Sequence, residues 1–244
     1  MTETTLGDGP ALNPTLDPRA LAEVYARRGR LHIPAFFGPQ SAPRVHRALA
    51  EETTYNLSIN SGAKVFDISP GDWAKLTSEQ KKALVDSAAA GALRGFQLMY
   101  DTHRLSDEGE AYADQKSYLA KIVAFLEGEP FLSFVRQVTG EREIAFADAQ
   151  ATRYGPGHFL TAHNDDIAGK NRLAAYVINM TPYWRAEWGG VLLFLGKEGH
   201  VEEGYVPCFN ALNIFKVPQV HLVSHVAPFA NAKRLSITGW LRAR

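Results

Sequence analysis

The chain has 244 residues, of which 45% are hydrophobic, and its 26 Lys and Arg residues balance its 26 Asp and Glu residues. These values are typical of a soluble globular protein with one large or two small domains. Because nucleic-acid binding depends on clustered Lys and Arg, the neutral balance argues against a nucleic acid as a direct partner.

The cysteine content and the lengths of the apolar segments limit the cellular compartments that the sequence suggests. Cys208 is the single cysteine, so the chain forms no internal disulfide. No window approaches the roughly 20 apolar residues that span a bilayer, and Met1 to Pro18 lacks a cationic stretch leading into an apolar run. We therefore expect a cytoplasmic protein with no membrane partner.

The N-terminal half is predicted to be mainly helical after a leader. Residues 1–17 contain several Gly and Pro residues and are expected to be flexible. Thr77 and Gln80 have the spacing of a capping box, and Gly140 is placed to end a helix. Helices are predicted at 18–28, 43–52, from 77 towards 90, at 119–126 and from 130 to 140, with a short strand at 31–34.

Two segments of this half lack a helical period. Tyr55 to Asp72 mixes Gly, Ser, Asn and Pro, and Thr102 to Ala113 is also expected to be irregular. They would serve either as a lid that folds over a binding site or as ordinary surface loops.

The C-terminal half is predicted to be rich in strands. Strands are expected at 144–154, 158–165, 172–180, 191–195, 211–216, 221–226 and 234–242. Strands without intervening helices favour two facing antiparallel sheets, so the predicted fold is α+β, mainly β, with a double-stranded β-helix (jelly roll) core. We expect one catalytic domain over 18–244, in which 18–142 supplies the supporting helices and lid and 143–244 supplies the core.

One motif in this core points to metal chemistry. His163 and Asp165 lie two residues apart, so on a strand both side chains point to the same face. Two imidazoles and one carboxylate can occupy one face of an iron(II) ion and leave the other positions open. His225 is expected to supply the second imidazole, and Arg234 follows it nine positions later in the sequence. An oxygenase is therefore the first hypothesis, and a reducing compartment suits iron(II).

Beyond this motif, the chain resembles the prolyl hydroxylase type of the 2-oxoglutarate- and iron(II)-dependent dioxygenases. Within that family it is most similar to the enzymes that hydroxylate a prolyl residue of a ribosomal protein. The resemblance rests on Tyr154-Gly155-Pro156-Gly157-His158-Phe159-Leu160, His163-Asn164-Asp165-Asp166, Trp188-Gly189-Gly190-Val191-Leu192, His225-Val226 and Arg234-Leu235-Ser236-Ile237-Thr238-Gly239-Trp240.

The resemblance implies roles for individual residues. His163, Asp165 and His225 would be the catalytic iron(II) ligands. Arg234, nine positions after His225 as in the family, would hold the distal carboxylate of 2-oxoglutarate. A guanidinium suits this role because it makes two parallel charge-assisted hydrogen bonds to a carboxylate. Dioxygen would be the second cosubstrate, with ascorbate as a reductant.

Two tyrosines are expected to complete the cosubstrate site. Tyr154 is the expected second contact to 2-oxoglutarate, because its hydroxyl is one of the few polar groups on its strand. Where many relatives have a tyrosine on the next strand, alignment places Val177 or Ile178 here. Tyr176 lies two positions before Ile178, on the same strand face, and is expected to substitute for that tyrosine.

Two alternatives to the metal ligands remain open. His221 lies four residues before His225 and would share its strand face, so a different register would make His221 the ligand. Asp166 competes with Asp165, but adjacent strand residues face opposite ways, which gives Asp166 a loop or turn role.

The function implied by the resemblance is hydroxylation of an unactivated C–H bond, with release of succinate and CO2. The expected substrate is a prolyl residue of a protein or peptide. A free amino acid or another small molecule is the alternative, because fold does not fix substrate. Two other classes also fit the sequence: a non-catalytic cupin-like module that binds a metal or ligand, which would not need Arg234, and a structural domain without a metal.

Overall fold

A computed structural model of the chain describes residues 9–62, 64–108, 110–112, 114 and 116–244. Residues 1–8 of the predicted leader lie outside these residues. Its described part, from Gly9 onward, is docked on the domain, because Leu12 forms a β-bridge with Phe37 and the Asn13 amide donates to the Phe36 carbonyl at 2.9 Å.

The helices begin and end where local signals place them. Asp17 caps the first helix through its carboxylate, and Gly29 ends it in a left-handed conformation. The predicted capping box of Thr77 and Gln80 is confirmed, as is the helix end at Gly140. The helices are α1 (Pro18–Arg28), α2 (Ser41–Glu51), α3 (Pro70–Lys75), α4 (Ser78–Ala92), α5 (Tyr118–Leu126) and α6 (Glu129–Thr139), with a short 3-10 helix at Ala186–Trp188.

The strands form one strongly curved sheet. They are β1 (Arg30–Pro34), β2 (Asn56–Ser61), β3 (Lys64–Ile68), β4 (Leu98–Asp107), β5 (Glu110–Ala111), β6 (Phe146–Ala147), β7 (Ala149–Tyr154), β8 (Phe159–His163), β9 (Arg172–Met180), β10 (Leu192–Leu195), β11 (Val201–Tyr205), β12 (Phe209–Lys216), β13 (His221–Val223) and β14 (Arg234–Arg242). Their order along the sheet is β1-β12-β9-β14-β7-β4-β8-β13-β10-β11, with β2, β3, β5 and β6 attached at the side.

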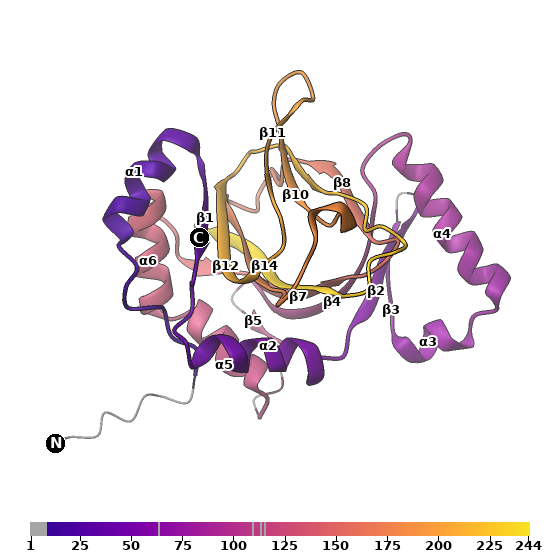
Figure 1. The fold of residues 1–244 in the computed structure, drawn as a ribbon, viewed down its shortest axis with the longest axis horizontal. Coiled ribbons are helices and arrows are strands. Elements are labelled where there is room, and N and C mark those ends of the chain that lie inside the picture. The colour runs from indigo at the N-terminus through magenta and orange to yellow at the C-terminus, as the bar shows by residue number, and fades with distance from the viewer. Residues whose placement is uncertain (1–8, 63, 109, 113, 115) are drawn as a thin grey trace.

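This sheet curls into the nearly closed barrel of a double-stranded β-helix, as predicted (Figure 1). Its two end strands, β1 and β11, meet through side chains. Arg28 and Arg30 reach across to Glu203 at 2.7 Å each, and Arg30 also contacts Glu202 at 3.0 Å. The α-helices lie outside the barrel, with α1 and α6 at the left, α2 and α5 below, and α3 and α4 at the right (Figure 1).

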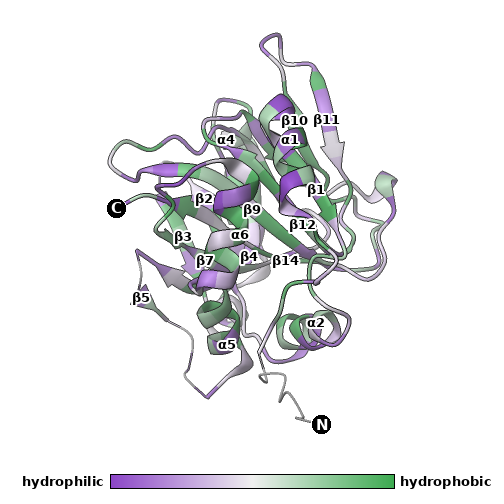
Figure 2. Cartoon of the chain, turned by 90° about the vertical axis from the view of Figure 1, so that its left-hand side faces the viewer, coloured by the Kyte–Doolittle hydropathy of each residue, from purple (hydrophilic) through white to green (hydrophobic). Residues whose placement is uncertain are grey.

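Strand β9 shows how the two faces of the barrel wall differ. Ala175 and Val177 pack inside the barrel, whereas Tyr176 and Ile178 belong to the large core formed with the helices. Hydrophobic residues concentrate on the strands, and hydrophilic residues on the outer helices and loops (Figure 2). None of the helices within the described residues has the length and apolar character that crossing a membrane requires.

The two segments expected to be irregular instead contain strands. Strands β2 and β3 pair with each other in the first segment, and β4 inserts into the sheet between β7 and β8. Both segments border the same groove beside the barrel mouth, through Asn56, Asp67, Thr102 and Asp107 among others. Their polar residues face this groove, so these strands lack the apolar runs by which the other strands were recognised.

Candidate active site

Three potential metal ligands meet inside the barrel: His163, Asp165 and His221. His163 ends β8, His221 begins β13, and the two are paired across the sheet. One ligand atom from each of the three residues lies within 4.8 Å of the others. Asp165 follows β8 with a left-handed backbone (φ 62°), which Asp tolerates better than most residues. Its carboxylate oxygens lie 3.5 Å from His163 Nε2 and 3.4 Å from His221 Nε2.

Hydrogen bonds orient both imidazoles for metal binding. His163 Nδ1 lies 2.9 Å from the Thr161 carbonyl, and His221 Nδ1 lies 2.8 Å from the Gln219 carbonyl. A carbonyl only accepts, so Nδ1 carries the proton and the Nε2 lone pair points towards Asp165. Burial, and then the nearby His163, lower the pKa of His221 to about 4. His221 is therefore neutral at physiological pH, the form that binds a metal.

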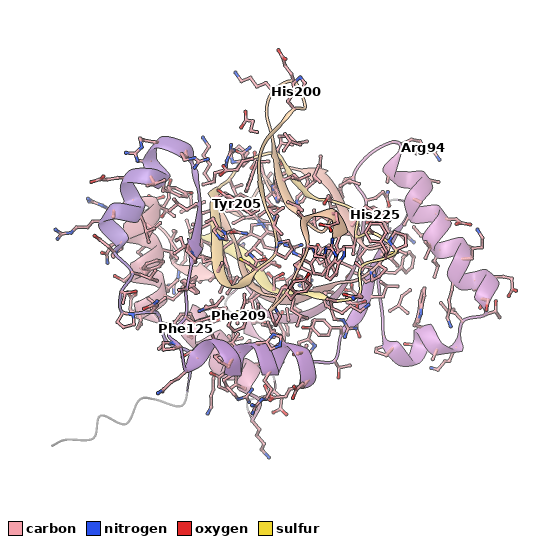
Figure 3. All side chains as sticks on the ribbon, in the orientation of Figure 1. Arg94, Phe125, His200, Tyr205, Phe209 and His225 are labelled. Carbon is pink, nitrogen blue, oxygen red and sulfur yellow. The ribbon has the colours of Figure 1, made fainter. Side chains whose placement is uncertain are left out.

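His225, the expected third ligand, does not lie at this cluster. Strand β13 ends at Val223, so the alternation that would place His225 on the same face as His221 does not continue. His225 stacks on Phe159 instead, with ring centroids 6.2 Å apart, and lies at the edge of the barrel towards α4 (Figure 3). The structure does not bring His225 to this cluster, and it brings in the alternative, His221.

Arg234 lies in the same cavity as the three ligands. The cavity has a volume of about 380 Å³ and is lined mainly by apolar side chains. Arg234 begins β14 and is 2% exposed. Among the described residues, its Nε and Nη1 atoms have no hydrogen-bond partner. Burying an unpaired cation is costly, so this arrangement fits a site that receives an anion.

Tyr154 supplies a second polar group beside Arg234. The two residues face each other across β7 and β14, and the guanidinium carbon lies 4.8 Å from the ring centre. Burial raises the pKa of Tyr154 well above its usual value. The phenol therefore keeps its proton, which remains free to be donated to a ligand carboxylate.

Tyr176 is not placed as expected. It shares a face with Ile178, but that face is turned towards the helices. Its ring packs against Phe131 of α6, and its hydroxyl donates to the Asp148 carbonyl at 2.7 Å. Tyr176 borders the cavity, but its hydroxyl is already bonded to the Asp148 carbonyl and is not offered to a ligand in the cavity.

Arg172 lies between the cavity and its mouth, and the sequence interpretation used it only for alignment. It donates to the Asp165 carbonyl at 3.1 Å, and its guanidinium lies 3.5 Å from the ring centre of Trp240. Its Nε has no partner among the described residues. Burial lowers the pKa of Arg172. Two apolar side chains, Phe96 and Ile167, are exposed at the same mouth.

A polar groove continues outward from this mouth. Its volume is about 480 Å³, and Tyr100, Arg172 and Trp240 border both the groove and the metal cavity. Acidic and basic groups both line it, including a buried ion pair of 3.0 Å between Asp148 and Arg242. The cavity therefore opens onto a surface able to hold a polar ligand larger than the cavity itself.

Comparison with known proteins identifies the class. Residues 149–242, which include all three candidate ligands and Arg234, match the 2OG-Fe(II) oxygenase superfamily. The match covers the strand-rich part of the chain and supports a 2-oxoglutarate-dependent dioxygenase. The family implies iron(II), 2-oxoglutarate and dioxygen, and the His-Asp-His cluster with the unpaired Arg234 fits the first two. No curated protein matches the chain.

Solved structures share its fold. A prolyl-4-hydroxylase from Pseudomonas putida is 18% identical, with a TM-score of 0.59 over 93% of this chain and 100% of that one. An oxidoreductase of the 2OG-Fe(II) oxygenase family from Burkholderia pseudomallei is 14% identical, with a TM-score of 0.61 over 94% and 92%. A prolyl hydroxylase from Trichoplax adhaerens, in complex with a hypoxia inducible factor peptide, is 15% identical, with a TM-score of 0.59 over 93% and 89%. At these sequence identities, the comparison shows that the folds are similar and no more.

Proposed function

We propose that the chain hydroxylates a prolyl residue of a protein or peptide. In this reaction one oxygen atom of O2 enters the substrate C–H bond and the other enters succinate, which is released from 2-oxoglutarate with CO2. Iron(II) would be held by His163, Asp165 and His221, and when bound it supplies the activation of dioxygen. The chain supplies the binding, orientation and exclusion of water around it.

The observation that carries this proposal is the unpaired guanidinium of Arg234 in the cavity of the three ligands. A dicarboxylate could place one end at the His-Asp-His cluster and the other against Arg234 and Tyr154. The fork of Arg234 would pair with the distal carboxylate, and the Tyr154 proton would supply a third hydrogen bond. A non-catalytic metal-binding module would not need the buried guanidinium of Arg234.

The features of the mouth support a prolyl substrate. Phe96, Ile167 and Trp240 offer apolar and aromatic surface to a pyrrolidine ring, which lacks hydrogen-bonding groups on its carbons. Arg172 Nε, still without a partner, could donate to the carbonyl of the same residue. The polar groove beyond Trp240 would take the flanking polypeptide, whose peptide groups need hydrogen-bond partners.

The test is succinate formation by iron-loaded protein, with ascorbate as reductant, against a pool of proteome-derived peptides and against free amino acids. We expect succinate to rise with the peptides, together with peptides heavier by one oxygen atom at proline. Arg172→Ala is the substrate-side variant and should lose the peptide-dependent succinate while retaining 2-oxoglutarate binding. Stimulation by free amino acids alone would replace the prolyl proposal with the small-molecule alternative.

A further inference from the structure

Tyr154 lies in the middle of a row of side chains that crosses five strands. The register pairs Arg234 of β14 with Tyr154 of β7 and brings Tyr100 of β4 next to Tyr154. Tyr100 in turn pairs with Ser58 of β2, which pairs with Asp67 of β3. Facing residues on neighbouring strands are close enough for their side chains to interact. The row therefore joins the candidate cosubstrate anchor to the rim of the polar groove.

The contacts along this row are specific. The rings of Tyr100 and Tyr154 are stacked, with centroids 4.9 Å apart and planes inclined by 15°. The Arg234 guanidinium lies 4.8 Å from the Tyr154 ring centre, so Tyr154 is held between an aromatic ring and a cation. The next pair in the row, Ser58 and Asp67, is hydrogen-bonded.

We propose that Tyr100 is a positioning residue of the cosubstrate site, which holds the Tyr154 ring and, through it, the guanidinium of Arg234. This inference rests on the proposed binding of 2-oxoglutarate by Arg234 and Tyr154. Tyr100 lies on β4, outside the residues 149–242 that match the superfamily. The N-terminal half of the chain thus contributes to cosubstrate binding as well as supporting the barrel.

The reason is that Arg234 Nε and Nη1 have no hydrogen-bond partner among the described residues. A buried cation with two unpaired nitrogens gains by shifting towards any polar group or water it can reach. Aromatic stacking and cation–π contacts are each modest, but together they hold the fork where a carboxylate can meet it, and a site organised in advance binds more tightly. Without the Tyr100 ring, Tyr154 gains rotational freedom and the fork is no longer held.

The test measures 2-oxoglutarate affinity by anaerobic calorimetry on iron(II)-loaded protein. Tyr100→Leu should weaken binding about tenfold, a factor typical of losing one stacked pair. Tyr100→Phe should restore affinity to within about twofold of wild type, because it keeps the ring. If Tyr100→Leu does not fold, Tyr100→Met, which keeps the volume without the aromatic face, takes its place. Tyr55→Leu, at a buried tyrosine away from the cavity, is the matched control and should leave affinity unchanged.

A double-mutant cycle with Tyr154→Leu separates positioning from a direct contact. If Tyr100 acts through Tyr154, adding Tyr100→Leu to Tyr154→Leu causes no further loss of affinity. Two results would overturn the inference: a Tyr100→Leu protein that is less stable but binds 2-oxoglutarate normally, or losses that multiply in the double variant. If wild-type protein does not bind 2-oxoglutarate at all, the proposed function fails instead.

Discussion

Replacing Arg234 by Met should abolish tight 2-oxoglutarate binding without harming the unliganded fold. Arg234 offers two unpaired nitrogens in a buried position, and a hydrogen bond to a charged group contributes about 1.5 to 3 kcal/mol. Two such bonds amount to about 3 to 6 kcal/mol, and each 1.4 kcal/mol is a factor of ten. The dissociation constant for 2-oxoglutarate should therefore rise by roughly two to four orders of magnitude.

The same unpaired cation destabilises the protein when no ligand is present. Replacing a buried charge with an apolar side chain of similar volume is often neutral or stabilising. The melting temperature of metal-free Arg234→Met should therefore equal or exceed that of wild type, whereas 2-oxoglutarate added to the iron(II)-loaded proteins should raise it only for wild type.

Calorimetric titration and thermal unfolding of the two proteins check this pair of expectations. Arg234→Lys serves as the control, because it keeps the charge without the fork and should bind with intermediate affinity. An Arg234→Met protein that binds 2-oxoglutarate within about twofold of wild type would refute the assigned anchor. A large loss of stability in the unliganded variant would refute the claim that the guanidinium is unpaired.

Three further predictions concern single residues. Tyr176→Phe should lower the unfolding free energy by about 1 to 3 kcal/mol, because the buried Asp148 carbonyl loses its hydrogen-bond donor. Its 2-oxoglutarate affinity, measured by calorimetry, should be unchanged. Reduced affinity would mean that Tyr176 does contribute to cosubstrate binding. The pKa of His221 is about 4 in the folded chain, against an ordinary value of 6.5. The unfolding free energy of metal-free protein, measured in urea, should therefore fall by up to about 3 kcal/mol as the pH drops from 6.5 to 4. An equal fall in His221→Gln would contradict this cause. Asp166 is exposed, and its backbone N–H donates to the Asn164 side-chain oxygen. Asp166→Ala should therefore retain bound iron in metal analysis. Loss of iron from this variant would mean that Asp166, and not Asp165, is the ligand.

Much of the fold could be predicted because local signals and global packing agree. The predicted bounds of α1, β9 and β14 match the structure, since each has a clear cap or a long apolar run. Strand β4 could not be found in this way. Its inward-facing residues, such as Tyr100, Thr102 and Arg104, line a polar groove, so the strand lacks the usual apolar character.

The site was predicted in part, and its errors have a common cause. His163 and Asp165 could be identified from their residue types and spacing, and Arg234 from the family resemblance. Choosing between His221 and His225 depended on where β13 ends, and strand ends are the least certain feature of a sequence. The position of Tyr176 depended on which face of β9 is turned to the helices, and both faces of that strand are buried.

Iron binding by His221→Ala and His225→Ala tests the central claim most directly. Each variant is mixed anaerobically with iron(II) and 2-oxoglutarate, and bound iron and the visible charge-transfer band are measured against wild type. His221→Ala should lose both, and His225→Ala, whose imidazole lies against Phe159, should keep both. Loss of iron from His225→Ala with retention in His221→Ala would contradict the metal centre described here.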